Sequence, residues 1–151
     1  MSRLITKEGL KKLQDELAER KGKIRQEIAV AIKEAKEQGD LSENAEYSEA
    51  KRQQGENESR IAELEMVIKN SQVVERNDSM EGIQMSSRVK VKFNGSEMEF
   101  QIVSSNEADP ARFKISNESP MGKAFIGKDK GNRVEVVTPG GVIKYTILDT
   151  K

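Results

Sequence analysis

The sequence predicts an α+β protein in which a long antiparallel α-helical coiled-coil hairpin precedes a small antiparallel β-sheet domain with one short helix. Three observations indicate this fold class. In the first half, apolar residues recur every seven positions, as in helices that pack along a seam. In the second half, apolar and polar residues alternate, as in strands with one buried face. All three Pro residues and seven of the eleven Gly residues also lie in the second half, where turns are therefore expected.

The helical prediction rests on two heptad series in each arm of the hairpin. The first arm carries Leu10, Leu17, Ile24 and Ala31, with Leu13, Ile28 and Ala35 on the neighbouring row. The second arm carries Tyr47, Gln54, Ile61 and Ile68, with Ala50, Asn57, Leu64 and Ser71 beside them. Only Gly39-Asp40 interrupts the pattern decisively, so we expect a hairpin over residues 1–75 with its acidic tip at 39–43. Gln54 and Asn57 are polar seam residues, which either specify the register of the two arms or mark a functional bend.

A polar stretch at residues 76–82 is the expected linker to a β-rich domain at residues 83–151. Val89, Val91 and Phe93 alternate with basic residues, and Asn94-Gly95 is typical of a tight hairpin turn. Asp109-Pro110 predicts a further turn. Ser119-Pro120 predicts the start of a short helix that Gly127 ends, and the turn at 139–141 joins a last pair of strands.

The composition excludes several classes of chemistry. The 151 residues include no Cys and no His, which excludes disulfides, thiolate metal sites and a Ser-His triad. The 26 basic and 26 acidic side chains balance, which disfavours a general nucleic-acid binder. Because no apolar run approaches the ~18 residues of a membrane span, we expect a soluble cytoplasmic protein without a membrane partner.

The tip of the hairpin carries the candidate chemical groups, Asp40 and Glu43. Their spacing is that of a capping box, in which both carboxylates serve the first turn of the following helix. Alternatively, both carboxylates project beyond the hairpin and share a divalent cation. Two carboxylates form a poor isolated Mg²⁺ site, so this second role requires another protein's active site.

Two separated motifs resemble a known family. Residues 39–47, Gly-Asp-Leu-Ser-Glu-Asn-Ala-Glu-Tyr, and residues 50–55, Ala-Lys-Arg-Gln-Gln-Gly, are similar to the signature of the bacterial Gre transcript cleavage factors, and most closely of their GreA branch. Residues 119–128, Ser-Pro-Met-Gly-Lys-Ala-Phe-Ile-Gly-Lys, with Thr-Pro-Gly-Gly at 138–141, resemble the family's C-terminal domain. The resemblance extends from about Leu4 to the end of the sequence and implies an FKBP-like fold for the β-rich domain.

The resemblance implies a transcription elongation factor that activates bacterial RNA polymerase without being an enzyme itself. The hairpin would enter the secondary channel of the polymerase and the C-terminal domain would dock on its rim. Asp40 and Glu43 would hold a Mg²⁺ jointly with the polymerase active site, and the free protein would bind none tightly. The polymerase would then cleave backtracked nascent RNA near its 3′ end. Because the hairpin satisfies its own seam, we expect a monomer.

The resemblance also implies functions for further residues, and each of these residues has a purely structural interpretation as well. Lys36, Lys51 and Arg52 match the region of RNA and channel contacts, although a solvated helix face explains basic residues equally well. Asn44 and Tyr47 belong to the tip motif, and the resemblance places them among the same RNA and channel contacts. In the structural interpretation, Asn44 supports tip geometry or merely tolerates the first turn, and Tyr47 packs on the seam. The segment that docks on the rim is matched by Ser119 and Pro120, which also suit a helix start.

Three rival functions remain open at this stage. The first is a secondary-channel regulator that inhibits or modulates the polymerase without promoting cleavage. The second is a prolyl isomerase, which requires an aromatic-lined pocket, yet the β-rich domain has only five aromatic residues. The third is a purely structural coiled coil, which leaves the tip motif unexplained.

Overall fold

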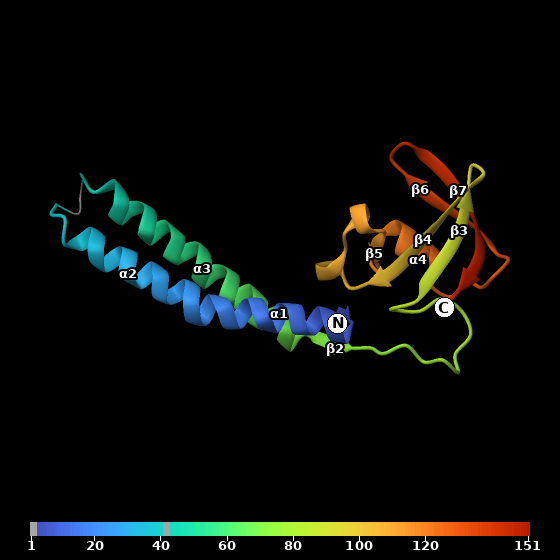
Figure 1. Ribbon diagram of the computed structural model, residues 1–151, viewed down its shortest axis with the longest axis horizontal. Coiled ribbons are helices and arrows are strands. Elements are labelled where there is room, and N and C mark those ends of the chain that lie inside the picture. The colour runs from blue at the N-terminus through green and yellow to red at the C-terminus, as the bar shows by residue number, and fades with distance from the viewer. Residues whose placement is uncertain (1–2, 41–42) are drawn as a thin grey trace. The chain divides into compact units, whose positions relative to one another are not determined.

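The computed structural model describes residues 3–40 and 43–151, and its contacts divide the chain into two compact units (Figure 1). The first, which we call the hairpin unit, comprises Lys11–Ser71. The second, which we call the sheet unit, combines the N-terminal segment through Leu10 with Gln72–Lys151. The prediction placed that N-terminal segment with the hairpin, whereas its contacts assign it to the sheet unit.

Two helical arms form the hairpin unit, as predicted. The first arm is continuous through α1 (Lys7–Glu19), a π-helical turn η1 (Arg20–Ile24) and α2 (Arg25–Lys36). The second arm is the single helix α3 (Ala45–Lys69), which lies alongside α2 (Figure 1). Seven of the predicted seam residues are buried, three in the first arm and four in the second: Leu13, Ile28, Ala35, Ala50, Asn57, Ile61 and Leu64.

One predicted seam position is wrong, and the π-helical turn explains why. Ala31 is exposed and Ile32 is half-buried in its place. A π-helical turn inserts one extra residue into the helix and shifts the phase of every later side chain. Leu13 and Ile28, both buried, are accordingly one residue further apart than two heptads. The seam therefore continues from Leu17 to Ile32 and bypasses Ala31.

The polar seam residue Asn57 joins the two arms at this π-helical turn. Its side chain is 3% exposed, and its Nδ2 donates to the carbonyl oxygen of Arg20 at 3.1 Å. The guanidinium of Arg20 donates back to Asn57 Oδ1 at 3.1 Å. Because both hydrogen bonds require Arg20 and Asn57 to lie opposite each other, they specify the register of the arms.

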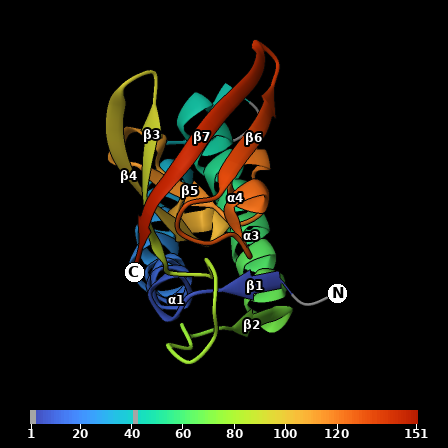
Figure 2. The ribbon, with the colours of Figure 1, turned by 90° about the vertical axis from the view of Figure 1, so that its right-hand side faces the viewer.

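The sheet unit contains a five-stranded sheet in the order β5-β4-β3-β7-β6. Its strands are β3 (Arg88–Phe93), β4 (Ser96–Val103), β5 (Lys114–Ser116), β6 (Arg133–Thr138) and β7 (Gly141–Thr150). Figure 2 shows β3, β7 and β6 side by side. The α+β fold class is confirmed, with one correction, since β5 pairs parallel with β4. The ten residues between β4 and β5 include two 3-10 turns, η3 (Ser105–Glu107) and η4 (Pro110–Arg112). This connection returns the chain far enough for β5 to run in the same direction as β4.

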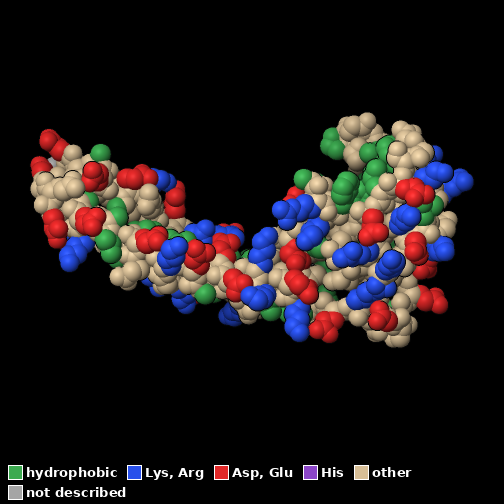
Figure 3. All heavy atoms as spheres, viewed as in Figure 1, with side chains coloured by type: hydrophobic (Ala, Val, Ile, Leu, Met, Phe, Trp, Pro, Cys, Tyr) green, Lys and Arg blue, Asp and Glu red, His purple; other side chains and the backbone are tan. Residues whose placement is uncertain are grey.

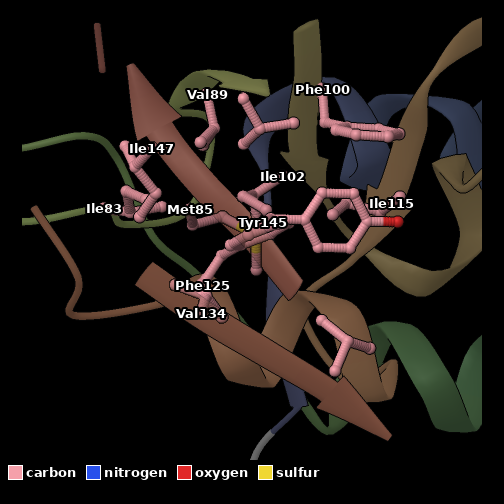
Figure 4. Close-up of a cluster of buried hydrophobic side chains, with 12 residues drawn as sticks. Ile83, Met85, Val89, Phe100, Ile102, Ile115, Phe125, Val134, Tyr145 and Ile147 are labelled. Atoms are coloured by element: carbon pink, nitrogen blue, oxygen red, sulfur yellow. The ribbon is translucent and has the colours of Figure 1, made fainter. Parts of the chain in front are cut away.

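The core of the sheet unit lies between the strands and the short helix α4 (Pro120–Phe125) (Figure 4). Phe125 is fully buried, with its ring 5.6 Å from that of Tyr145 and 6.5 Å from that of Phe100. These rings pack against one another, so they fill the interior in which a prolyl isomerase would need an open pocket. The remaining core side chains are aliphatic: Ile83, Met85, Val89, Val91, Ile102, Ile115, Val134, Val136 and Ile147.

A second sheet, which the sequence did not predict, joins β1 (Arg3–Ile5) to β2 (Ser71–Val73). The next residue, Thr6, is buried, and its amide donates to Ser104 Oγ at 2.7 Å. Asn106 Nδ2 donates to the carbonyl oxygen of Gly9 at 3.0 Å. These bonds explain why the N-terminal segment belongs to the sheet unit. Among the helices of the described residues, none has the length and apolar character needed to cross a membrane.

Candidate functional site at the hairpin tip

The tip begins where α2 ends, and its backbone turns at Gly39. Glu37 caps α2, and Gly39 has φ +118°, a conformation that side-chain-bearing residues rarely adopt. Asp40 and Glu43, the two predicted site residues, are both exposed on either side of residues 41–42, which lie outside the described part of the chain. The structure thus brings both carboxylates to the end of the hairpin.

The N-cap residue of α3 is Asn44, whereas the predicted capping box placed Asp40 in that position. Helix α3 begins at Ala45, and Asn44 Oδ1 accepts the amide hydrogen of Tyr47 at 3.1 Å. The other end of the same side chain, Nδ2, donates to the carbonyl oxygen of Ala35 at 2.7 Å. A neutral side chain therefore caps α3 and ties it to the last turn of α2. Neither carboxylate is needed as the N-cap of α3.

An open hollow of about 440 Å³ lies at the tip and is lined mainly by acidic and amide side chains. Among the described residues that line it, Asp40, Glu43 and Glu46 are acidic and none is basic. Sequence reasoning missed Glu46, although the acidic run of the motif was a signal for it. Carboxylate oxygens are the ligands that Mg²⁺ prefers. Red side chains mark this end of the hairpin unit in Figure 3.

The described tip residues do not form a complete metal site by themselves. Within residues 3–40 and 43–151, no group of three or more His, Cys, Asp or Glu side chains is arranged to hold a metal ion. Mg²⁺ requires near-octahedral coordination and commonly completes it with waters and substrate phosphates. Asp40 and Glu43 could therefore supply two ligands to an ion whose remaining ligands come from elsewhere.

The predicted basic contact residues differ in whether their charged groups already bond to side chains of the same helix. Lys36 is exposed in the last turn of α2, and Lys51 Nζ donates to Gln54 Oε1 at 2.8 Å. Arg52 pairs with both Glu49 and Glu56 on its own helix. The hydrogen bonds from Arg52, with a smaller contribution from Gln53, lower the pKa of Glu49 to about 2. A contact between Arg52 and any ligand would have to compete with these two carboxylates.

Tyr47 lies half-buried on the seam beside the tip. Its amide is the donor that Asn44 satisfies, so its backbone position is fixed by the cap of α3. This placement agrees with the packing interpretation of Tyr47, and its predicted contact with RNA or the channel stays a prediction.

Ser119 and Pro120, the predicted docking residues, form the start of α4. Ser119 Oγ accepts from the Gly122 amide at 3.0 Å and donates to the Ser116 carbonyl oxygen at 2.7 Å, while Pro120 occupies the first turn. A Cβ on Gly122 would lie 2.0 Å from that same carbonyl oxygen, so only Gly fits there. Helix capping by Ser119 is confirmed. The docking role of Ser119 and Pro120 stays a prediction.

Comparison with known proteins identifies relatives along the whole chain. Residues 3–73 match the family model described as "Transcription elongation factor, N-terminal", and residues 78–151 match "Transcription elongation factor, GreA/GreB, C-term". The transcription elongation factor GreA of Acetivibrio thermocellus is 47% identical over 152 residues, covering 98% of this chain and 95% of the relative. GreA of Clostridium botulinum strain Eklund 17B is 50% identical, covering 98% and 94%.

A solved structure, that of the GreA factor homolog 1 (Gfh1) protein of Thermus thermophilus, is 28% identical, with a TM-score of 0.46 over 100% of this chain and 99% of that chain.

The two family models together extend from Arg3 to Lys151 with a gap of only four residues, and both tip and α4 motifs lie within the matched ranges. The resemblance predicted from these two motifs is therefore confirmed. The chain belongs to the GreA/GreB family of transcription elongation factors.

Proposed function

We propose that the protein binds bacterial RNA polymerase and stimulates the polymerase to cleave backtracked nascent RNA, so that arrested transcription resumes. The observation that carries this proposal is the arrangement of the tip. Two exposed carboxylates, Asp40 and Glu43, lie at the end of the hairpin, while the neutral Asn44 caps the adjacent helix. The family supports the same conclusion, because the relatives named above are transcription elongation factors.

Asp40 and Glu43 act by completing a metal site in the polymerase. Their oxygens supply two ligands, and the hairpin fixes where those ligands are presented. A Mg²⁺ held in this way would lower the pKa of an attacking water and stabilise charge on the scissile phosphate. The polymerase provides the remaining ligands and the bond to be cleaved, so the protein is an activator and not itself an enzyme.

The remaining predicted residues position the protein and the RNA. Lys36, Lys51 and Arg52, with Asn44 and Tyr47, would contact the channel or the backtracked RNA 3′ end. Ser119 and Pro120 would dock on the rim of the secondary channel. We expect a monomer that acts in the cytoplasm together with the polymerase and binds no Mg²⁺ tightly by itself.

A transcript cleavage assay tests this proposal. Polymerase is halted in a backtracked complex with RNA labelled at its 5′ end, and shortening of the RNA is followed after the protein and Mg²⁺ are added. Asp40→Asn and Glu43→Gln keep the size of each side chain and remove its charge. Each variant should slow cleavage at least about 10-fold. Removing a residue that only hydrogen-bonds to a metal ligand already lowers metal affinity or activity by about 10-fold or more, so removing a ligand should cost at least as much.

Glu37→Gln is the matched control, because Glu37 is also exposed near the tip but does not line the hollow. It should cleave like the wild type. Competition against a labelled wild-type protein establishes that each variant still occupies the polymerase. If the wild type inhibits RNA synthesis without shortening the transcript, the protein is the rival secondary-channel regulator and the proposal is wrong.

A further inference from the structure

Phe113 is an exposed aromatic ring on the sheet unit that belongs neither to the buried core cluster nor to the tip. It follows η4 and directly precedes β5. Of the six aromatic residues, which all lie in the described part of the chain, Phe113 alone is exposed, with 49% of its surface accessible. Its ring makes a T-shaped contact with Phe100 at 5.7 Å, which leaves about half of the residue open.

The backbone at Phe113 is in a conformation that favours glycine. Its φ of 58° and ψ of 32° are left-handed, and a bulky residue is rare there. The position is held by the turn, in which the Phe113 amide donates to the Pro110 carbonyl oxygen at 3.1 Å. Glycine would adopt this turn without strain, yet the chain places a large ring there. A strained residue with an exposed side chain is a candidate for a functional contact outside the fold.

Basic side chains line the hollow beside this ring. A hollow of about 200 Å³ beside Phe113 adjoins a second hollow, with which it shares Arg88 and Glu99. Together the two hollows are lined by five basic side chains: Arg88, Lys90, Arg112, Lys114 and Lys151. Only two acidic side chains line them, Glu99 and Asp149, although the whole chain has a formal net charge of zero. Figure 3 shows Lys and Arg side chains gathered on this unit.

The ion pairs of Arg88 and Arg112 are long and exposed, so these two guanidinium groups remain available to a ligand. Arg88 lies 3.8 Å from Glu99, and Arg112 lies 3.5 Å from Asp109. The side chain of Arg112 is 77% accessible. Exposed pairs of this kind contribute little to stability and exchange readily for another anion.

We propose that the surface formed by Phe113, Arg88, Arg112 and Lys114, which we call the Phe113 surface, binds single-stranded nucleic acid. The three basic side chains would contact phosphates, and one unpaired base would stack on the ring. Stacking on an aromatic side chain beside a basic groove is the usual way in which proteins hold single strands. A duplex buries its base faces and so offers no base to the ring. An acidic peptide could use the charges but would gain nothing from stacking.

This inference goes beyond the proposed function and does not depend on it. The RNA contacts proposed above lie at the tip of the hairpin unit, whereas the Phe113 surface consists of residues of the sheet unit. Loss of one activity therefore leaves the other measurable in a separate assay.

Fluorescence anisotropy of the full-length protein with labelled oligouridine tests the inference. The oligomer is about ten nucleotides long, within the range of known single-strand sites, and the salt concentration is low, about 50 mM. Oligodeoxythymidine of the same length distinguishes DNA from RNA. A duplex RNA and a polyglutamate peptide are the competing ligands. We expect both single strands to bind more tightly than the duplex and polyglutamate not to bind.

Substitutions at the ring separate stacking from charge. Phe113→Leu keeps an apolar side chain against Phe100 but has no aromatic face, and it should weaken binding about tenfold, as expected for the loss of one stacked base. Phe113→Tyr keeps the ring and should bind like the wild type. The double variant Arg112→Gln with Lys114→Gln should reduce the salt dependence by about 1.4 in log–log slope, since each single-strand phosphate contact contributes about 0.7.

Arg133→Gln is the control for net charge, because Arg133 is exposed on β6, at the opposite edge of the sheet from β5. Arg133→Gln should bind like the wild type, and thermal unfolding should show that every variant is folded. The inference is overturned if neither single strand binds, if Phe113→Leu binds like the wild type, or if Arg133→Gln weakens binding as much as the double variant Arg112→Gln with Lys114→Gln. Equal binding of the duplex or of polyglutamate would also overturn it.

Discussion

Replacing Asn44 with Ala removes two hydrogen bonds that hold the tip together. One bond caps α3 through the Tyr47 amide, and the other ties the cap to the Ala35 carbonyl oxygen at the end of α2. Loss of an N-cap side chain destabilises a helix by about 1 kcal/mol, and loss of a second hydrogen bond adds about 1 kcal/mol. We therefore expect the tip of Asn44→Ala to open about 2 kcal/mol more easily than that of the wild type.

Hydrogen exchange measures this opening locally. The Ser48 amide donates to the Asn44 backbone carbonyl oxygen at 3.1 Å, a bond that every variant at position 44 can still form. A change of about 2 kcal/mol corresponds to roughly 30-fold faster exchange of that amide. Asn44→Ser keeps a capping oxygen but cannot reach Ala35, so its exchange should accelerate by roughly fivefold, the equivalent of about 1 kcal/mol.

Gln38→Ala is the matched control, since Gln38 is also an exposed residue of the tip, and it should exchange like the wild type. Amides in the middle of α3 report on the whole hairpin unit, and their exchange should change less than that of Ser48. If Asn44→Ala leaves Ser48 exchange unchanged, or if Asn44→Ser and Asn44→Ala behave alike, Asn44 does not hold the tip as we describe.

Three further predictions concern the body of the protein. Hydrogen bonds from Arg60, together with those from Arg20, lower the pKa of Glu16 to about 2. The ionised Glu16 therefore stabilises the fold above its usual pKa of 4.5, and this stability is lost as the pH falls toward 2. In urea unfolding, Glu16→Gln should show a smaller difference between the free energies of unfolding at neutral and at acidic pH than the wild type shows. Gly122→Ala should lower the free energy of unfolding by about 1–3 kcal/mol or more, because its Cβ would overlap a backbone carbonyl oxygen. Asn57→Ala should lower it by about 1–3 kcal/mol, because it removes the two cross-arm hydrogen bonds between the buried Asn57 side chain and Arg20.

Different outcomes would contradict each of these predictions. An unchanged dependence of unfolding on pH in Glu16→Gln would mean that the cross-arm ion pair adds nothing to stability. Wild-type stability of Gly122→Ala, measured by thermal unfolding, would mean that the start of α4 shifts freely. Full stability of Asn57→Ala would mean that the register of the arms is fixed by the apolar seam alone.

The elements with strong local patterns were predictable from the sequence. Leu13 and Leu64 lie on the heptad rows and are buried, because the period of a packed helix is visible in sequence. Asn94 and Gly95 have φ of 53° and 80°, which a tight hairpin turn requires, and the strands on either side of them pair in register.

Features set by contacts between distant residues were not predictable. The π-helical turn at Arg20–Ile24 is joined to Asn57 on the other arm, and a strict seven-residue count cannot show an inserted residue. The parallel pairing of β5 follows from the path of the two 3-10 turns before it. Strands β1 and β2, of three residues each, are too short to carry a periodic signal.

At the tip, the sequence located the segment but not the capping residue. Asp40 and Asn44 are both good N-cap residues, and local propensity does not choose between them. The choice depends on Ala35, whose carbonyl oxygen at the end of α2 accepts a hydrogen bond from the Asn44 amide group. An Asp side chain has no amide hydrogen to donate, so only the folded hairpin shows why α3 begins after Asn44.

The dependence of transcript cleavage on Mg²⁺ concentration tests most directly whether the tip carboxylates complete a metal site in the polymerase. Cleavage of backtracked RNA is measured over a Mg²⁺ titration, with saturating wild-type protein and with saturating Asp40→Asn. If Asp40 is a ligand, the variant should need at least about 10-fold more Mg²⁺ to reach its half-maximal rate. An unchanged Mg²⁺ requirement would contradict the shared metal site, whatever the maximal rate of the variant.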